Sequence, residues 1–112
     1  MHYVREIELM LCAAADVVSG QPITVARDGR NFCICKVDNE YYVLDDLCTH
    51  GNASLGRDGL LNGFELVCGH HNGAFDVRTG QPLRRPCIVR LLTYSTFIRS
   101  GDLYIRLGKV FG

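Results

Sequence analysis

The sequence predicts an all-β fold, with short antiparallel strands arranged as a sandwich or barrel. Apolar and β-branched residues occur in many short runs, turn residues separate the runs at regular intervals, and no helical period of any length is present. The runs that we interpret as strands span residues 21–26, 31–37, 41–44, 64–67, 74–77, 88–92, 94–98 and 103–107.

Turn residues indicate how these strands connect. Asp28-Gly29 ends the first run, and Asp38-Asn39-Glu40 joins the second run to the third as a hairpin. Asp45-Asp46 ends the third strand, and turn residues then crowd the stretch from 56 to 63. Residues 82–86, with a proline at each end, are expected to form an irregular link.

Length and composition indicate one domain, residues 1–112, with 47% hydrophobic residues and therefore a modest core. Twelve basic residues balance twelve acidic ones, so broad binding to nucleic acid is not expected. No window approaches the roughly twenty apolar residues that span a bilayer. Leu9 to Ala15 could pass for a short secretory core, but Glu6 and Glu8 precede it where a signal peptide carries positive charge. We expect a cytoplasmic protein without a membrane partner.

Two short stretches combine cysteine with histidine. Cys48 and His50 form a Cys-x-His pair, and after seventeen intervening residues Cys68 is followed by the adjacent His70 and His71. Two soft sulfur ligands and two nitrogen ligands in a short chain indicate a metal centre. We expect residues of about 45–80 to form a small metal-binding subdomain inserted in the larger sheet.

The other four cysteines have no histidine nearby, and without an export signal a disulfide framework is not expected. Cys33 and Cys35 have one residue between them, so in a strand they face the same side. We expect small, buried hydrophobic side chains at all four positions, Cys12, Cys33, Cys35 and Cys87.

The spacing suits two irons better than one zinc ion. Structural zinc sites usually use pairs such as Cys-x₂-Cys with His-x₃-His, whereas each loop here mixes the two ligand types. If one iron binds both cysteines and the other binds two histidines, each loop reaches along the cluster and contacts both irons. A structural Cys₂His₂ zinc module with a protein-binding role remains the alternative from a different class.

The pattern resembles the Rieske [2Fe-2S] motif, in which two histidines replace two cysteines on one iron. Gly51 after the first pair fits this motif, as do Gly73-Ala74-Phe75-Asp76 and Thr79-Gly80 after the second. With the preceding hairpin and the strands after Pro82, the resemblance covers most of the chain. In length and layout the sequence is similar to the small soluble Rieske ferredoxins of bacterial aromatic-ring-hydroxylating dioxygenase systems.

The resemblance implies a role and a ligand set. One [2Fe-2S] cluster would be held by Cys48 and Cys68 on one iron and by His50 and His71 on the other, with His70 facing solvent. The chain would be an electron carrier without catalytic residues, shuttling single electrons from an NAD(P)H-dependent ferredoxin reductase to a terminal oxygenase. Candidate contact residues flank the ligands: Leu47, Asn52, Ala53, Leu55, Asn72 and His70.

Two residues depart from the family pattern. Gly69 stands where the family usually has proline, which implies a less pre-organised loop. Asn72 stands where the family usually has glycine, and asparagine tolerates positive φ better than most residues.

Rieske proteins of respiratory complexes have cysteines at the positions of Ala53 and His70 and a serine at that of Gly73. Because this chain lacks these groups, fewer donors reach the cluster, and we expect a reduction potential near the low end of the Rieske range of roughly −150 to +300 mV.

Two other Rieske proteins are alternatives to the ferredoxin. One is the Rieske-type small subunit of a nitrite reductase, which has a comparable size and fold. The other is a fragment of a Rieske oxygenase, although no mononuclear-iron domain follows in this sequence.

Overall fold

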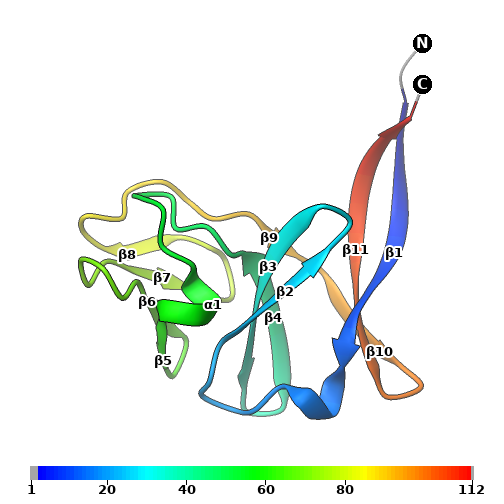
Figure 1. Ribbon diagram of the computed structural model, residues 1–112, viewed down its shortest axis with the longest axis horizontal. Helices are drawn as coiled ribbons and strands as arrows, with labels where there is room; N and C mark the ends of the chain where they lie inside the picture. Colours follow the sequence, from blue (N-terminus) through cyan, green and yellow to red (C-terminus); the bar gives the residue numbers. More distant parts are fainter. Residues whose placement is uncertain (1–2, 112) are drawn as a thin grey trace.

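The computed structural model describes residues 3–111, and its regular secondary structure is almost entirely antiparallel strands, which confirms the all-β prediction (Figure 1). The elements, in chain order, are β1 (Tyr3–Ala13), η1 (Ala14–Asp16), β2 (Ile23–Arg27), β3 (Arg30–Val37), β4 (Glu40–Asp45), α1 (Leu55–Asp58), β5 (Leu60–Asn62), β6 (Glu65–Val67), β7 (Ala74–Asp76), β8 (Pro82–Arg84), β9 (Thr93–Tyr94), β10 (Thr96–Arg99) and β11 (Asp102–Phe111).

The strands form three sheets. Their orders are β1-β11-β10, β2-β3-β4-β9 and β5-β6-β7-β8. In Figure 1 the long β1–β11 pair lies at one end of the molecule, the β5–β8 sheet lies at the other, and the β2-β3-β4-β9 sheet lies between them.

Two-residue turns set the register of three hairpins. The predicted hairpin is confirmed, because β3 pairs with β4 from Phe32 opposite Asp45 to Val37 opposite Glu40. Its turn residues, Asp38 and Asn39, both have positive φ. Positive φ at both central positions is characteristic of the turns that match strand twist, and short polar residues or glycine tolerate it best. Asp28-Gly29 and Ser100-Gly101 repeat this conformation in the other two hairpins.

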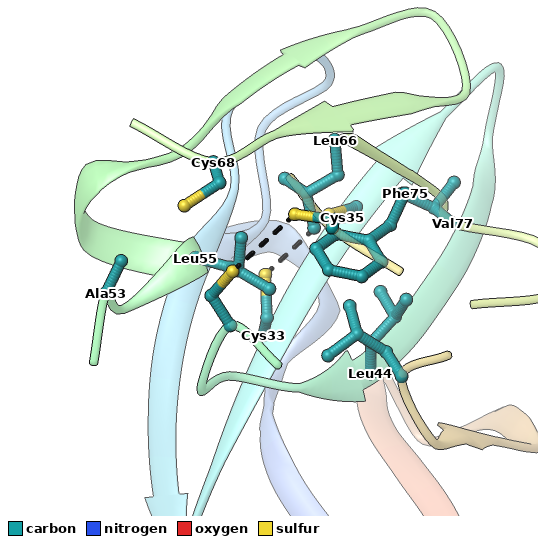
Figure 2. Packing of buried hydrophobic residues seen from close by; sticks show 12 residues of the cluster. Cys33, Cys35, Leu44, Ala53, Leu55, Leu66, Cys68, Phe75 and Val77 are labelled. Carbon is teal, nitrogen blue, oxygen red and sulfur yellow. Dashed lines mark hydrogen bonds between the residues drawn. The ribbon is translucent and has the colours of Figure 1, made fainter. Parts of the chain in front are cut away.

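The central strand β3 supplies side chains to two hydrophobic cores. Phe32 and Ile34 pack in a body core, whose other buried members are Leu11, Val17, Val43, Leu103 and Ile105. Cys33 and Cys35 face the opposite side, because successive side chains alternate along a strand, and pack in a second core, the site core (Figure 2). Other buried members of the site core are Leu44, Cys48, Ala53, Leu55, Leu66, Cys68, Phe75, Val77, Cys87 and Leu91.

The prediction for the four other cysteines is confirmed in three cases. Cys33, Cys35 and Cys87 are buried, whereas Cys12 is half-buried and packs against the body core.

Two predictions about strands were wrong, and one strand was not predicted. Residues 88–92 are not a strand, and their apolar side chains at Ile88, Val89 and Leu92 are exposed. Residues 82–84, predicted as irregular, form the edge strand β8, which begins at Pro82, a position where the missing N–H costs no sheet hydrogen bond. Residues 3–13 form β1, which the sequence pattern did not reveal because its partner β11 is almost the full chain length away. Among residues 3–111 no helix is long and apolar enough to cross a membrane.

Candidate metal centre

The first ligand loop, residues 48–53, is closed by backbone hydrogen bonds. The amide of Cys48 donates to the carbonyl of Ala53 at 3.0 Å, and the amide of Gly51 donates to the carbonyl of Cys48 at 3.3 Å. A β-bridge between Leu47 and Ser54 holds the two ends of the loop together. His50 therefore lies on a tight turn whose base is fixed.

The second ligand loop, residues 68–73, repeats this construction. The amide of Cys68 donates to the carbonyl of Gly73 at 2.7 Å, which is the same five-residue span as in the first loop. The amide of Asn72 donates to the carbonyl of Cys68 at 3.1 Å, and Asn72 has a φ of 61°. Asn72 thus adopts the positive φ that asparagine tolerates better than most residues.

The four candidate ligands divide into a buried pair and an exposed pair. Cys48 and Cys68 are each 2% exposed and belong to the site core, whereas His50 and His71 are exposed. The rings of His50 and His71 face each other edge to face, with centroids 5.1 Å apart. The two loops thus bring both sulfurs together inside the protein and both imidazoles together at its surface.

Backbone amides are directed at one of the sulfurs. Burial raises the pKa of the Cys68 thiol, while hydrogen bonds from the amides of His70 and His71 act in the opposite direction and lower it. Such N–H groups favour negative charge on sulfur. This charge preference suits a metal-bound thiolate.

The His70 ring lies near both Asp58 and His71. Its Nε2 lies 4.0 Å from a carboxylate oxygen of Asp58, and both side chains are about half exposed. Its ring centroid is 6.5 Å from that of His71.

Asp46 holds the first ligand loop against the body. This carboxylate is 4% exposed and accepts hydrogen bonds from the Ser54 hydroxyl at 2.6 Å, the Gly56 amide at 2.8 Å and the Thr24 hydroxyl at 2.9 Å. Thr24 belongs to β2 and Gly56 to α1, so one side chain ties the loop to both elements.

A third segment, residues 85–92, covers the two loops and is called here the covering segment. The hydroxyl of Thr49 in the first loop donates to the carbonyl of Val89 at 2.6 Å. Just before the segment, the Arg84 guanidinium donates to the carbonyl of Asn72 at 2.8 Å and reaches the second loop. Arg84 and the covering segment thus contact both ligand loops.

Cys87 of the covering segment lies against the candidate ligands. Its sulfur is 3.8 Å from that of Cys48, and the side chain is 3% exposed. Burial is the main factor that raises the pKa of the Cys87 thiol to about 12, with the hydrogen bond to Cys48 next.

The sequence motif did not reveal the roles of Asp46 and Cys87. Cys87 follows a proline, whereas Cys12, Cys33 and Cys35 do not, and this is the one sequence signal that could have separated it from core residues.

Glycine permits close backbone approaches at two positions in the second loop. A Cβ on Gly69 would collide with the carbonyl oxygen of Asp58, and one on Gly73 would collide with the sulfur of Cys87. Gly69, which replaces the usual proline, is thus packed against α1.

The candidate contact residues separate by exposure. Leu47 is 58% exposed, and Asn52, His70 and Asn72 are also exposed. Ala53 and Leu55 are buried in the site core, so these two candidates are not exposed for contact with a partner. An open groove of about 870 Å³ runs beside His50 and is flanked by Arg30 and Arg57.

The donor set fits a two-iron cluster. A [2Fe-2S] cluster of the mixed type needs two thiolates for one iron and two imidazoles for the other. The buried sulfur pair and the exposed imidazole pair supply this set. Among the described residues, 3–111, no three His, Cys, Asp or Glu side chains surround a position for one metal ion.

Comparison with known proteins gives the same family. Residues 8–95 match the model of the Rieske [2Fe-2S] domain. The chain is 37% identical over 99 residues to the ferredoxin component of the p-cumate 2,3-dioxygenase system of Pseudomonas putida, covering 88% of this chain and 84% of that protein.

Two solved structures of similar fold are a ferredoxin and a chain from a complex that contains one. A ferredoxin of Sphingomonas yanoikuyae B1 superposes with a TM-score of 0.86 at 37% identity, covering 90% of this chain and 99% of that one. A chain from a complex of reduced oxygenase and oxidised ferredoxin in carbazole 1,9a-dioxygenase gives 0.82 at 38% identity, covering 88% of this chain and 92% of that one. On its motif spacing, fold and sequence similarity, this chain belongs to the Rieske [2Fe-2S] domain family.

Proposed function

We propose that this protein is the ferredoxin component of an aromatic-ring-hydroxylating dioxygenase system. It carries single electrons from an NAD(P)H-dependent ferredoxin reductase to a terminal oxygenase and does not itself transform a substrate. Two similarities support this role. The sequence is similar to the ferredoxin component of the p-cumate system, and the fold is similar to a chain solved in a complex of oxygenase and ferredoxin. We also propose a cytoplasmic location.

We further propose that Cys48 and Cys68 bind one iron of a [2Fe-2S] cluster and that His50 and His71 bind the other. The observation that carries this assignment is the pairing, on two loops of the same construction, of a buried sulfur with an exposed imidazole. His71 is favoured over His70 because its ring faces that of His50, whereas His70 lies toward Asp58. The ligands belong to a subdomain of about residues 45–80 within one Rieske domain.

The residues around the ligands have separable tasks in this role. When bound, a Rieske cluster accepts and releases one electron. The site core excludes water from the sulfur side, and the amides of His70 and His71 favour negative charge on Cys68. His50 and His71 open to solvent, so a partner docking there comes within a short distance of the site. A small interface of less than about 1,200 Å² suits such brief electron-transfer contacts.

The ligand assignment is tested by a matched pair of adjacent substitutions. H71A should abolish the cluster, because one iron loses a protein ligand, whereas H70A should keep it. The measurements are iron and acid-labile sulfide content, visible absorbance and the EPR spectrum of the reduced protein. A cluster of normal content in H71A, or its loss in H70A alone, would overturn the assignment.

The system assignment has its own test. Purified protein should accept electrons from an aromatic-oxygenase reductase with NAD(P)H and support turnover by that oxygenase. Reduction only by a nitrite reductase flavoprotein would favour the nitrite reductase alternative. A colourless protein with one bound zinc would favour the zinc module.

A further inference from the structure

We propose that Cys87 is a positioning residue of the cluster site, whose thiol donates a hydrogen bond to the sulfur of Cys48 and raises the reduction potential. This inference rests on the ligand assignment proposed above. It concerns a residue outside both ligand loops, supplied by the covering segment.

The geometry places Cys87 beside one ligand sulfur in a closed environment. The Cys87 and Cys48 sulfurs are 3.8 Å apart, within the range of a sulfur–sulfur hydrogen bond, and both side chains are nearly fully buried. If Cys48 binds iron as a thiolate, its sulfur has no proton, so the proton in this contact belongs to Cys87. Cys87 is thus the donor.

Close packing fixes the position of this sulfur. A Cβ on Gly73 would collide with the Cys87 sulfur and lie 3.1 Å from the Cys87 amide nitrogen. The absence of a side chain at Gly73 therefore leaves the space that the Cys87 sulfur occupies. The second ligand loop and the covering segment together hold the thiol next to Cys48.

The electrostatic effect of this contact has a defined sign. A donor to a cluster ligand stabilises the more negative, reduced state more than the oxidised state, because a hydrogen bond to a charged acceptor strengthens as its charge grows. Hydrogen bonds to cluster sulfurs are among the factors that set the potential of iron–sulfur proteins. Removal of the Cys87 proton donor should therefore lower the potential.

The test compares Cys87→Ala with Cys87→Ser by redox titration of the purified, cluster-loaded protein. C87A removes the donor, whereas C87S retains one as a hydroxyl. At the wild-type midpoint potential, C87A should show about a threefold lower ratio of reduced to oxidised protein, which is roughly 28 mV given 59 mV per tenfold change for one electron. C87S should stay at or above the wild-type ratio.

Two further variants control for packing and for loss of a cysteine elsewhere. C87V keeps an apolar group in place of the sulfur and should follow C87A even if alanine destabilises the loop. C12A removes a half-buried cysteine of the other core and should leave the ratio unchanged.

A second readout detects the proton directly. Pulsed EPR of the reduced wild-type protein in D₂O should show an exchangeable deuteron coupling that is absent from C87A. Unchanged potential and deuteron coupling in C87A, or equal shifts in C87A and C87S, would overturn the inference. If the wild-type protein bound no cluster, the proposed function itself would fail instead.

Discussion

Single residues determine how firmly the first ligand loop is held, and Asp46 is the central one. Its buried carboxylate accepts from a hydroxyl of β2, a hydroxyl at the end of the loop and an amide of α1. A buried carboxylate destabilises the folded state unless it accepts its full set of hydrogen bonds. If the carboxylate is removed, its buried donors lose their acceptor and destabilise the folded state in turn. The loop therefore depends on this side chain for its position.

Substitution of Asp46 by alanine should destabilise the protein, because three donors lose their acceptor. We expect the free energy of unfolding to fall by about 2–3 kcal/mol, which corresponds to a fall in Tm of roughly 10 °C. Thermal loss of the visible cluster absorbance measures this change. D16A, at an exposed aspartate of η1, is the control and should shift Tm little. An unchanged Tm in D46A would refute the role given to this carboxylate.

At the residue scale the sequence indicated candidate ligands but not the residues that support them. The spacing of Cys48, His50, Cys68 and His71 could be read directly, since each pair is local in the chain. Cys87 contacts Cys48 from 39 residues away, and no periodicity relates the two positions. Contacts of this kind depend on how the covering segment packs, which only the fold reveals.

At the scale of elements, polar side chains join strands β3, β4 and β9 at one end of their sheet. The Tyr94 hydroxyl of β9 donates to the carboxylate of Asp45 at the end of β4, and the guanidinium of Arg30 at the start of β3 donates to Tyr94. The Tyr94 ring also packs edge to face on Phe32, with centroids 5.3 Å apart. This junction lies where β4 runs into the first ligand loop.

The Tyr94 junction predicts a loss of stability at alkaline pH. Burial, with the hydrogen bond to Asp45 second, raises the pKa of Tyr94 well above its usual value. An unfolded tyrosine loses its proton near pH 10, whereas the folded one keeps it, so the unfolded state gains relative stability as pH rises above about 10. The denaturant midpoint should therefore fall more steeply with pH in the wild type than in Y94F. Parallel profiles of the two proteins would contradict this prediction.

The β3–β4 hairpin was predictable at this scale. The conformation of residues 88–92 and the pairing of β1 with a strand distant in sequence were not. Asp38-Asn39 lies between two apolar runs, so the β3–β4 hairpin could be read from local residues. The apolar run 88–92 looked like a strand, but its backbone follows the ligand loops and its exposed side chains have no sheet to pack on. β1 depends on pairing with β11, from Tyr3 opposite Phe111 onward, which no local pattern signals.

At the scale of the whole molecule, exposed apolar side chains gather on the segments that surround the candidate ligands. Leu47 precedes the first ligand loop, and Ile88, Val89 and Leu92 lie on the covering segment, each more than half exposed. Such residues commonly mark contact surfaces when they cluster. They form the surface at which we expect the oxygenase to dock.

A charge introduced on this surface should weaken docking without altering the cluster. V89D should lower the apparent kcat/KM of the oxygenase for this ferredoxin about tenfold, equivalent to roughly 1.4 kcal/mol, while the reduction potential stays unchanged. V18D is a matched control, since Val18 and Val89 are both 57% exposed and Val18 lies between η1 and β2. Steady-state assays over a range of ferredoxin concentrations measure the effect, and equal losses in both variants would refute the assigned surface.

The side-by-side imidazoles of His50 and His71 make up one open edge of the site, while the sulfur side is enclosed. Under the proposed function, the donor and the acceptor of the electron would compete for this one edge, so loading and unloading would have to alternate. Flux through the system would then pass through an optimum in the ratio of its components, and a surplus of oxygenase would hinder reduction of the carrier that serves it.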